Sequence, residues 1–445
     1  MPKITKKLIF MLKRKIQIKL ENWYKSEHKK ALLINGARQV GKTTAVREFA
    51  KKYYSHFVEI NFVKNPEAKI AFDGELSTAT IRANLSALGY GKFKEGNTLV
   101  FFDEIQECPN ARTAIKFLVE DGVFDYIESG SLLGINYKHV TSYPVGFETE
   151  IVLYPMDFEE YLWAREIDET IIDILKNAYI NKSPVPEFIH QQINKLYREY
   201  LIIGGMPDVV QKFVNTRDVG EAVNIQKSIL ATYRSDISNY AGKQQTIVRQ
   251  IFDSITSELG KQDKRFVLSN MEKGASFRKY EYPTQWLVDA GIAFYSFNTK
   301  VLEVPFEAVE NRRLFKLYMV DTGLLCSTMF RGIQFQVLNG DISVNEGALT
   351  ENFIACQLAS KGYSLHYYDK KSKQELDFVV ADKQKIRLIE VKSGKDYKRH
   401  TSLNRAIEEN KSKLEQSIVF SKENLEMTED ILYLPLYMSM FIEER

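Results

Sequence analysis

The first third of the chain alternates between short apolar runs and amphipathic stretches. Residues 31–35 form an apolar run that predicts a buried strand, and residues 44–50 place apolar side chains at helical spacing. Three further strand-like runs follow, at residues 57–62, 97–104 and 123–131. Strands that alternate with helices form parallel sheets. We therefore predict an α/β fold with its ligand site at the carboxyl ends of the strands.

The pattern changes twice beyond residue 160. Residues 161–242 predict helices around a Gly-Gly-Met-Pro turn, and residues 243–335 combine short helices with small strands, as winged helices do. In that segment we expect helices at 247–258, 267–273 and 282–290, and strands at 292–298, 301–304 and 316–320. A helix from residue 346 and strands at 365–368, 375–380 and 386–392 follow. The predicted domains are residues 1–160, 161–242, 243–335 and 336–445.

Composition narrows the class of protein further. The chain has 445 residues, of which 44% are hydrophobic and 27% charged, as in ordinary globular proteins. Its three cysteines are far apart, and the formal charge of +3 is too small to indicate nucleic-acid binding. No apolar run reaches the roughly 18 residues of a membrane span, so we expect a cytoplasmic protein without a membrane partner. The basic residues 1–30 predict an amphipathic helix, either beside the ligand site or with a solvated face.

The residues between the first strand and the first helix carry the most specific chemistry. They fit the pattern G-x-x-x-x-G-K-[ST], in which backbone N–H groups and a helix N-terminus bind phosphate oxygens. Lys42 would reach the β- and γ-phosphates, and the Thr43 hydroxyl would bind Mg²⁺. The pattern predicts a P-loop NTPase with ATP and Mg²⁺ as cofactors. The expected nucleotide-binding residues are Gly36, Ala37, Arg38, Gln39, Val40, Gly41, Lys42, Thr43 and Thr44.

The strand predicted at residues 97–104 ends in an acidic pair. Asp103 can hold Mg²⁺, usually through water, and Glu104 can polarise the attacking water. We predict Lys42 and Glu104 as catalytic residues, and Thr43 with Asp103 as the Mg²⁺ site. Ser131, or Ser129 beside it, can present a hydroxyl to the γ-phosphate, although a serine-rich turn gives the same pattern.

Several of these segments resemble one family. Residues 35–44 and Asp103-Glu104-Ile105-Gln106 are similar to AAA+-like ATPases of bacteria and archaea that carry a C-terminal domain of unknown function. Further similar segments lie at residues 153–162, 200–207, 233–237 and 317–325. The resemblance implies an AAA+/RecA-like parallel sheet, a winged helix and a small restriction-endonuclease-like domain.

The chain departs from this family at one position. Many relatives have a Gly-Arg pair where this chain has Gly146 and Phe147. If that arginine senses phosphate in the relatives, its role here falls elsewhere or is absent. Arg234 is one candidate to stabilise charge in the transition state, and a buried ion pair between Arg234 and Asp236 is the structural alternative.

Two kinds of partner fit the predicted winged helix. Its last helix, near residues 278–286, can enter a DNA major groove. Phosphate contacts would come from Arg265, Lys273, Arg278 and Lys279. Winged helices also bind proteins, and residues 241–335 are only weakly basic. DNA and a protein client are both expected partners, and the sequence leaves the oligomeric state open.

The C-terminal strands carry a second constellation. Alternation along residues 386–392 places Glu390 and Lys392 on one face, next to Asp377 of the neighbouring strand. Together with Glu351 they resemble the PD-(D/E)xK nuclease site, in which carboxylates bind Mg²⁺ and the lysine orients water. Salt-bridged strand ends give the same pattern, so this metal site is one of two interpretations.

Three functions compete on these grounds. The one we favour is a Mg²⁺-dependent ATPase of AAA+ type that couples nucleotide state to a DNA- or protein-binding C-terminal half. The second is a metal-dependent DNA nuclease regulated by ATP. The third is a nucleotide switch with very slow turnover, which the departure at Phe147 favours.

Overall fold

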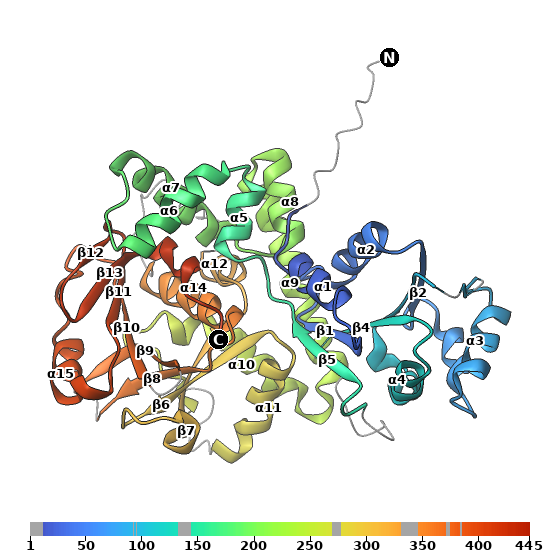
Figure 1. The fold of residues 1–445 in the computed structure, drawn as a ribbon. Coiled ribbons are helices and arrows are strands. Elements are labelled where there is room, and N and C mark those ends of the chain that lie inside the picture. Colours follow the sequence, from blue (N-terminus) through green and yellow to red (C-terminus); the bar gives the residue numbers. More distant parts are fainter. Residues whose placement is uncertain are drawn as a thin grey trace.

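The fold contains two β-sheets with helices packed around and between them (Figure 1). The computed structural model describes residues 12–91, 93–94, 96–131, 144–268, 277–330, 346–370, 374–382 and 385–445. The sheet at the right of Figure 1 belongs to the N-terminal third, and the sheet at the left belongs to the C-terminal half. No described helix is both long enough and apolar enough to span a membrane.

The first sheet is parallel throughout, with strand order β2-β3-β4-β1-β5. Its strands are β1 (Ala31–Gly36), β2 (His56–Asn61), β3 (Thr98–Asp103), β4 (Asp125–Ser131) and β5 (Glu148–Val152). The predicted parallel α/β sheet is confirmed. Strand β5 escaped prediction because it is an edge strand with mostly polar, partly exposed residues, so it has no apolar run.

Helices cover both faces of this sheet. Along β1, Leu32 and Ile34 face one hydrophobic cluster and Leu33 faces the other, as the alternation of a strand requires. The first cluster includes α1 (Ile16–Tyr24) and α2 (Lys42–Tyr53). The second includes α3 (Thr78–Ala87), α4 (Pro109–Asp121) and the 3-10 helix η1 (Pro66–Phe72). A second 3-10 helix, η2 (Ile105–Glu107), follows β3.

A helical region follows the first sheet, as predicted. Its helices are α5 (Phe158–Ala164), α6 (Glu169–Asn181), α7 (Glu187–Ile203), α8 (Pro207–Thr216), α9 (Val219–Tyr240), η5 (Gly242–Gln244) and α10 (Gln245–Leu259). The Gly204-Gly205 turn separates α7 from α8, and Pro207 occupies the first position of α8, where its missing N–H costs nothing.

The second sheet is mixed and has eight strands, in the order β12-β13-β11-β10-β9-β8-β6-β7. They are β6 (Ala293–Thr299), β7 (Glu310–Met319), β8 (Leu365–Asp369), β9 (Glu375–Asp382), β10 (Lys385–Val391), β11 (Ser417–Ser421), β12 (Glu426–Met427) and β13 (Ile431–Pro435). The helices of this half are α11 (Phe277–Asp289), η7 (Phe306–Ala308), α12 (Thr322–Met329), α14 (Glu346–Ser360), α15 (Thr401–Asn410), η8 (Lys411–Lys413) and η9 (Leu436–Phe441).

Strands β6 and β7 differ from the predicted wing. Strand β6 pairs in parallel with β8 through residues such as Ser296 and Leu365, so both strands extend the C-terminal sheet. Pairing on both sides buries the backbone of β6, which a separate two-stranded wing would leave exposed on one edge. The strand predicted at residues 301–304 does not form. Most of the helix predicted at 267–273, including Lys273, lies outside the described residues.

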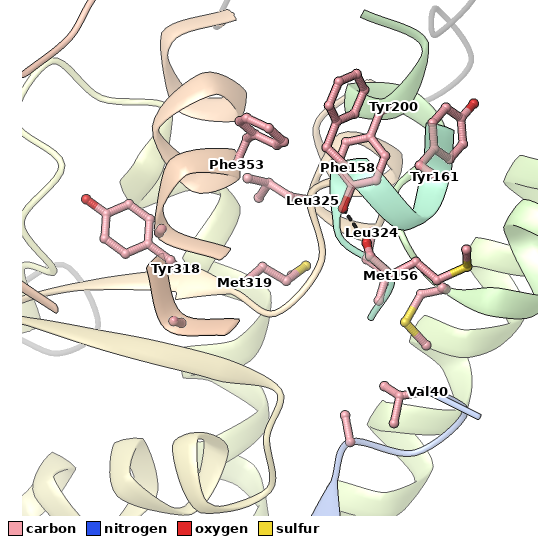
Figure 2. Packing of buried hydrophobic residues seen from close by; sticks show 14 of the residues in the cluster. Val40, Met156, Phe158, Tyr161, Tyr200, Tyr318, Met319, Leu324, Leu325 and Phe353 are labelled. Carbon is pink, nitrogen blue, oxygen red and sulfur yellow. Dashed lines mark hydrogen bonds between the residues drawn. The ribbon is translucent and has the colours of Figure 1, made fainter. Parts of the chain in front are cut away.

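One hydrophobic cluster joins all of these regions. Figure 2 shows Val40 of the first loop, Tyr200 of α7, Tyr318 of β7 and Phe353 of α14 within it. In the same view the Tyr200 hydroxyl donates to the Met156 carbonyl at 2.6 Å. The predicted boundary between residues 335 and 336 therefore crosses a continuous sheet and a shared core.

Candidate functional site

The loop between β1 and α2 is drawn tightly around the N-terminus of α2. A Cβ atom on Gly36 would lie 2.2 Å from the Leu153 carbonyl oxygen, so no larger residue fits there. Gly41 caps α2 with a left-handed φ of 96°, which favours glycine. The loop backbone and the helix N-terminus therefore form the anion-binding geometry that the motif predicts.

Seven of the nine predicted loop residues carry side chains, and these differ in burial. Those of Ala37 and Val40 are buried in the core and fix the loop to the rest of the fold. Gln39 and Thr44 are exposed. Arg14 also supports the loop, because its Nη1 donates to the Val40 carbonyl at 2.9 Å and its Nε to Glu160 at 3.1 Å. The segment before α1 thus lies beside the loop, whereas residues 1–11 of the helix predicted over 1–30 lie outside the described residues.

Lys42 is held over the loop by the loop itself. Its Nζ donates to the carbonyl oxygens of Gly36 and Ala37, both at 2.9 Å, and the side chain is 8% exposed. Burial lowers the pKa of Lys42 to about 8, against the opposing effect of the Glu104 and Asp103 carboxylates. The ammonium is therefore anchored to the backbone at the start of the glycine loop.

The side chain of Asp103, at the end of β3, contacts residues of β2, β4 and α2. Its carboxylate accepts hydrogen bonds from Thr43 Oγ1 at 3.0 Å, from Asn61 Nδ2 at 2.8 Å and from the Ser129 hydroxyl. The structure thus places Thr43 and Asp103 together, as predicted from their motifs 60 residues apart. We missed Asn61. The signal available was a polar residue at the end of β2, where parallel sheets gather their ligand-binding groups.

Glu104 directly follows β3 and adopts an unusual backbone conformation. Its φ of 56° is left-handed, which is uncommon outside glycine and occurs often at functional sites. Gln106 Nε2 donates to Glu104 Oε2 at 2.6 Å and so orients the carboxylate. Of the two serines considered for this edge, Ser129 binds Asp103, and the side chain of Ser131 lies outside the described residues.

Helix α9 reaches the same loop, with partners that differ from those we expected. Asp236 forms an ion pair with Arg38 of the loop, not with Arg234. Arg234 instead pairs with Asp253 of α10, its Nε lying 2.9 Å from Oδ1. The expected Arg234–Asp236 pair is wrong because residues two positions apart on a helix point about 200° apart around its axis. Arg234 points to α10, and Asp236 points to the loop.

In the predicted nuclease site, the Glu351 carboxylate is bound by lysines of the chain itself. Glu351 is bound by Lys264, by Lys316 at 3.2 Å and by the Tyr318 hydroxyl. Although burial acts in the other direction, these lysines lower the pKa of Glu351 to about 2. Burial and the charges of Glu351 and Glu390 raise the pKa of Asp377 well above its usual value.

Two further residues of the predicted nuclease site, Glu390 and Lys392, pair with each other. Lys392 Nζ binds Glu390 Oε1 at 2.6 Å. Within the described ranges, no group of three His, Cys, Asp or Glu side chains is arranged to hold a metal ion. The alternative interpretation, a salt-bridged strand end, describes the observed contact between Glu390 and Lys392.

The comparisons with known proteins agree with the geometry of the first sheet. Residues 28–162 match the family model of an AAA domain. Residues 28–162 are therefore similar to AAA domains. The matching segment includes the glycine loop, Asp103 and Glu104. Residues 194–334 and 346–438 match two domains of unknown function, DUF8612 and DUF4143. The comparison with curated proteins finds no significant match.

Several solved structures are similar to much of the chain. One is the Walker-type ATPase PABY2304 of Pyrococcus abyssi, with 15% identity, a TM-score of 0.42, and coverage of 72% of this chain and 96% of that chain. The ORC1 protein of Aeropyrum pernix in complex with DNA has 12% identity, a TM-score of 0.25, and coverage of 74% and 91%. The RuvB Holliday junction branch migration motor of Thermotoga maritima has 13% identity, a TM-score of 0.27, and coverage of 62% and 87%.

Proposed function

We propose that the AAA domain binds and hydrolyses ATP with Mg²⁺. The observation that carries this proposal is the contact of Thr43 with Asp103 at the mouth of the glycine loop. The two residues come from the two motifs that P-loop enzymes use to hold Mg²⁺. Hydroxyl and carboxylate oxygens are ligands that suit this ion, so the residues present fit the cofactor.

Each residue of the site has a role in this proposal. The loop N–H groups and Lys42 bind the phosphate chain, and Thr43 with Asp103 holds the metal. When bound, Mg²⁺ neutralises the charge that develops on the β- and γ-phosphate oxygens. Glu104, oriented by Gln106, accepts the proton of the attacking water.

The proposal includes coupling of the nucleotide to the C-terminal half. Helix α9 contacts the loop through Asp236 and packs against α10 and α12, which lead into the second sheet. A conformational change at the loop can therefore be transmitted through α9 to the C-terminal half, which we expect to bind DNA or a protein client. We infer a motor or switch of AAA type rather than an isolated hydrolase.

Two substitutions test the chemistry. We expect Lys42→Ala to abolish Mg-ATP binding, and Glu104→Gln to retain binding but to reduce hydrolysis by about 10²–10⁴-fold. Lys51→Ala is the matched control, because Lys51 is an exposed lysine on the same helix. Binding is measured by calorimetry and turnover by phosphate release, with and without added DNA. Parent-like turnover in Glu104→Gln would refute the role of the base.

The same assay separates the alternatives. A parent chain that binds Mg-ATP but releases phosphate no faster than Lys42→Ala, which is expected not to bind the nucleotide, would be the slow switch. We do not extend the proposal to DNA cleavage, because Glu351, a ligand of the predicted nuclease site, is already bound by Lys264 and Lys316.

A further inference from the structure

Three side chains of α9, those of Tyr233, Asp236 and Tyr240, contact Arg38 of the glycine loop. The Asp236 carboxylate pairs with Arg38 Nη1, and the Tyr233 hydroxyl donates to the Arg38 carbonyl at 3.2 Å. The Arg38 guanidinium also lies over the Tyr240 ring, with its Cζ 5.6 Å from the ring centre. Arg38, a residue inside the phosphate-binding motif, is therefore held by one face of α9.

Asp236 is an unusual residue to find at this place. Its side chain is 3% exposed, and within the described part of the chain its buried Oδ2 has no hydrogen-bond partner. Burial raises the pKa of Asp236 above its usual value, Arg38 opposes this, and the Glu104 charge adds to it. A buried carboxylate with one unsatisfied oxygen is costly, so a purely structural ion pair gives little reason for it.

Arg38 has capacity for a second anion. An arginine carries five N–H donors in a planar fork, and Asp236 accepts from one end of that fork. The Arg38 side chain is 26% exposed, whereas Asp236 lies behind it. The guanidinium can therefore bridge Asp236 on one side and a phosphate on the other without losing its anchor.

We propose that Asp236 is a positioning residue of the nucleotide site, which holds Arg38 toward the phosphate chain and makes α9 respond to a bound triphosphate. This inference rests on the proposed ATP binding. Asp236 does not touch the nucleotide itself, so its effect passes entirely through Arg38. Helix α9 has 22 residues and runs between the two sheets in Figure 1, so it carries the response toward the second half.

A double-mutant cycle on Mg-ATP affinity tests the proposal. We expect Arg38→Ala to weaken binding at least about tenfold, the loss typical of one charged hydrogen bond. Asp236→Ala should also weaken binding, and Arg38→Ala/Asp236→Ala should bind no worse than Arg38→Ala alone. Additive losses would mean that Asp236 acts independently of Arg38 and would overturn the proposal.

Further variants separate positioning from a loss of folding. Asp236→Asn keeps an oxygen that accepts from Arg38, so we expect it to recover part of the affinity lost in Asp236→Ala. Asp253→Asn removes an aspartate–arginine pair on the other side of α9 and should bind Mg-ATP like the parent. The melting temperature of each variant, measured without nucleotide, shows whether it is folded.

Hydrogen exchange measures a response to nucleotide that a purely structural Arg38–Asp236 pair would not produce. In the parent, a slowly hydrolysed ATP analogue with Mg²⁺ should slow amide exchange in residues 233–240, and Arg38→Ala should abolish this protection. A parent that binds no Mg-ATP would refute the proposed function. A parent that binds it, with Asp236→Ala binding equally well, would refute only this inference.

Discussion

Lys42 is the residue at which burial acts most directly on the proposed chemistry. Without a phosphate beside it, its pKa is about 8, because burial disfavours the charged form. A bound triphosphate stabilises the ammonium and raises that pKa. Above that pKa the free site loses this proton, so nucleotide binding must take one up. Affinity should therefore fall as the pH rises above about 8, by up to tenfold per pH unit.

Calorimetry at pH 8.5 in two buffers with different ionisation enthalpies measures this proton uptake. The control is Lys42→Arg, since a guanidinium keeps its proton over the whole range. We expect no buffer-dependent uptake in that variant. Equal uptake in Lys42→Arg and the parent would assign the proton to another group.

Single residues of the site differ in how far the sequence could predict them. Lys42, Thr43, Asp103 and Glu104 were predictable because their motifs fix their places on a strand–loop–helix unit and a strand end. The ion pair between Arg38 and Asp236 was not, because it joins positions 198 residues apart and depends on the path of α9. Periodicity describes one element at a time and contains no information about such contacts.

At the scale of elements, the turn between α7 and α8 packs tightly against two other segments, at Met156 and Asp321. Gly205 N donates to Asp321 Oδ2 at 2.6 Å, and a Cβ on Gly205 would lie 2.0 Å from the Met156 carbonyl oxygen. We expect Gly205→Ala to destabilise the protein by about 3 kcal/mol or more, because backbone atoms on both sides have no room to move.

Thermal unfolding of the purified variant measures this effect. Gly394→Ala is the matched control, because nothing lies within 4 Å of the Cβ that it would add. Its melting temperature should equal that of the parent. An unchanged melting temperature in Gly205→Ala would show that the turn is more adaptable than its contacts indicate.

Elements of the second half show why pattern alone misplaced a strand pair. The sequence predicted strands close to β6 and β7 and the three strands β8, β9 and β10. It did not predict which of them pair, because β6 and β8 are far apart in the chain and their parallel pairing leaves no turn signal between them. Short helices followed by strands also precede many winged helices, so the local order favoured the wrong grouping.

At the scale of the whole molecule, the shared sheet predicts that the C-terminal half cannot be divided. A chain cut between residues 335 and 336 would lose the pairing of β6 with β8 and expose apolar side chains of the common core. We expect residues 1–335 and 336–445, produced separately, to aggregate or to bind a hydrophobic dye, and to recover when produced together. Cooperative unfolding of either piece alone, at the temperature of the parent, would contradict this expectation.

The continuous eight-stranded sheet also has a consequence for the evolution of this chain. The segments matching DUF8612 and DUF4143 meet between β7 and β8, yet each supplies strands to the same sheet. A recombination event at that junction would pair each half with a partner it had not evolved alongside, and the hybrid sheet would have mismatched neighbours where β6 pairs with β8. Selection should therefore keep the two segments together as one heritable unit.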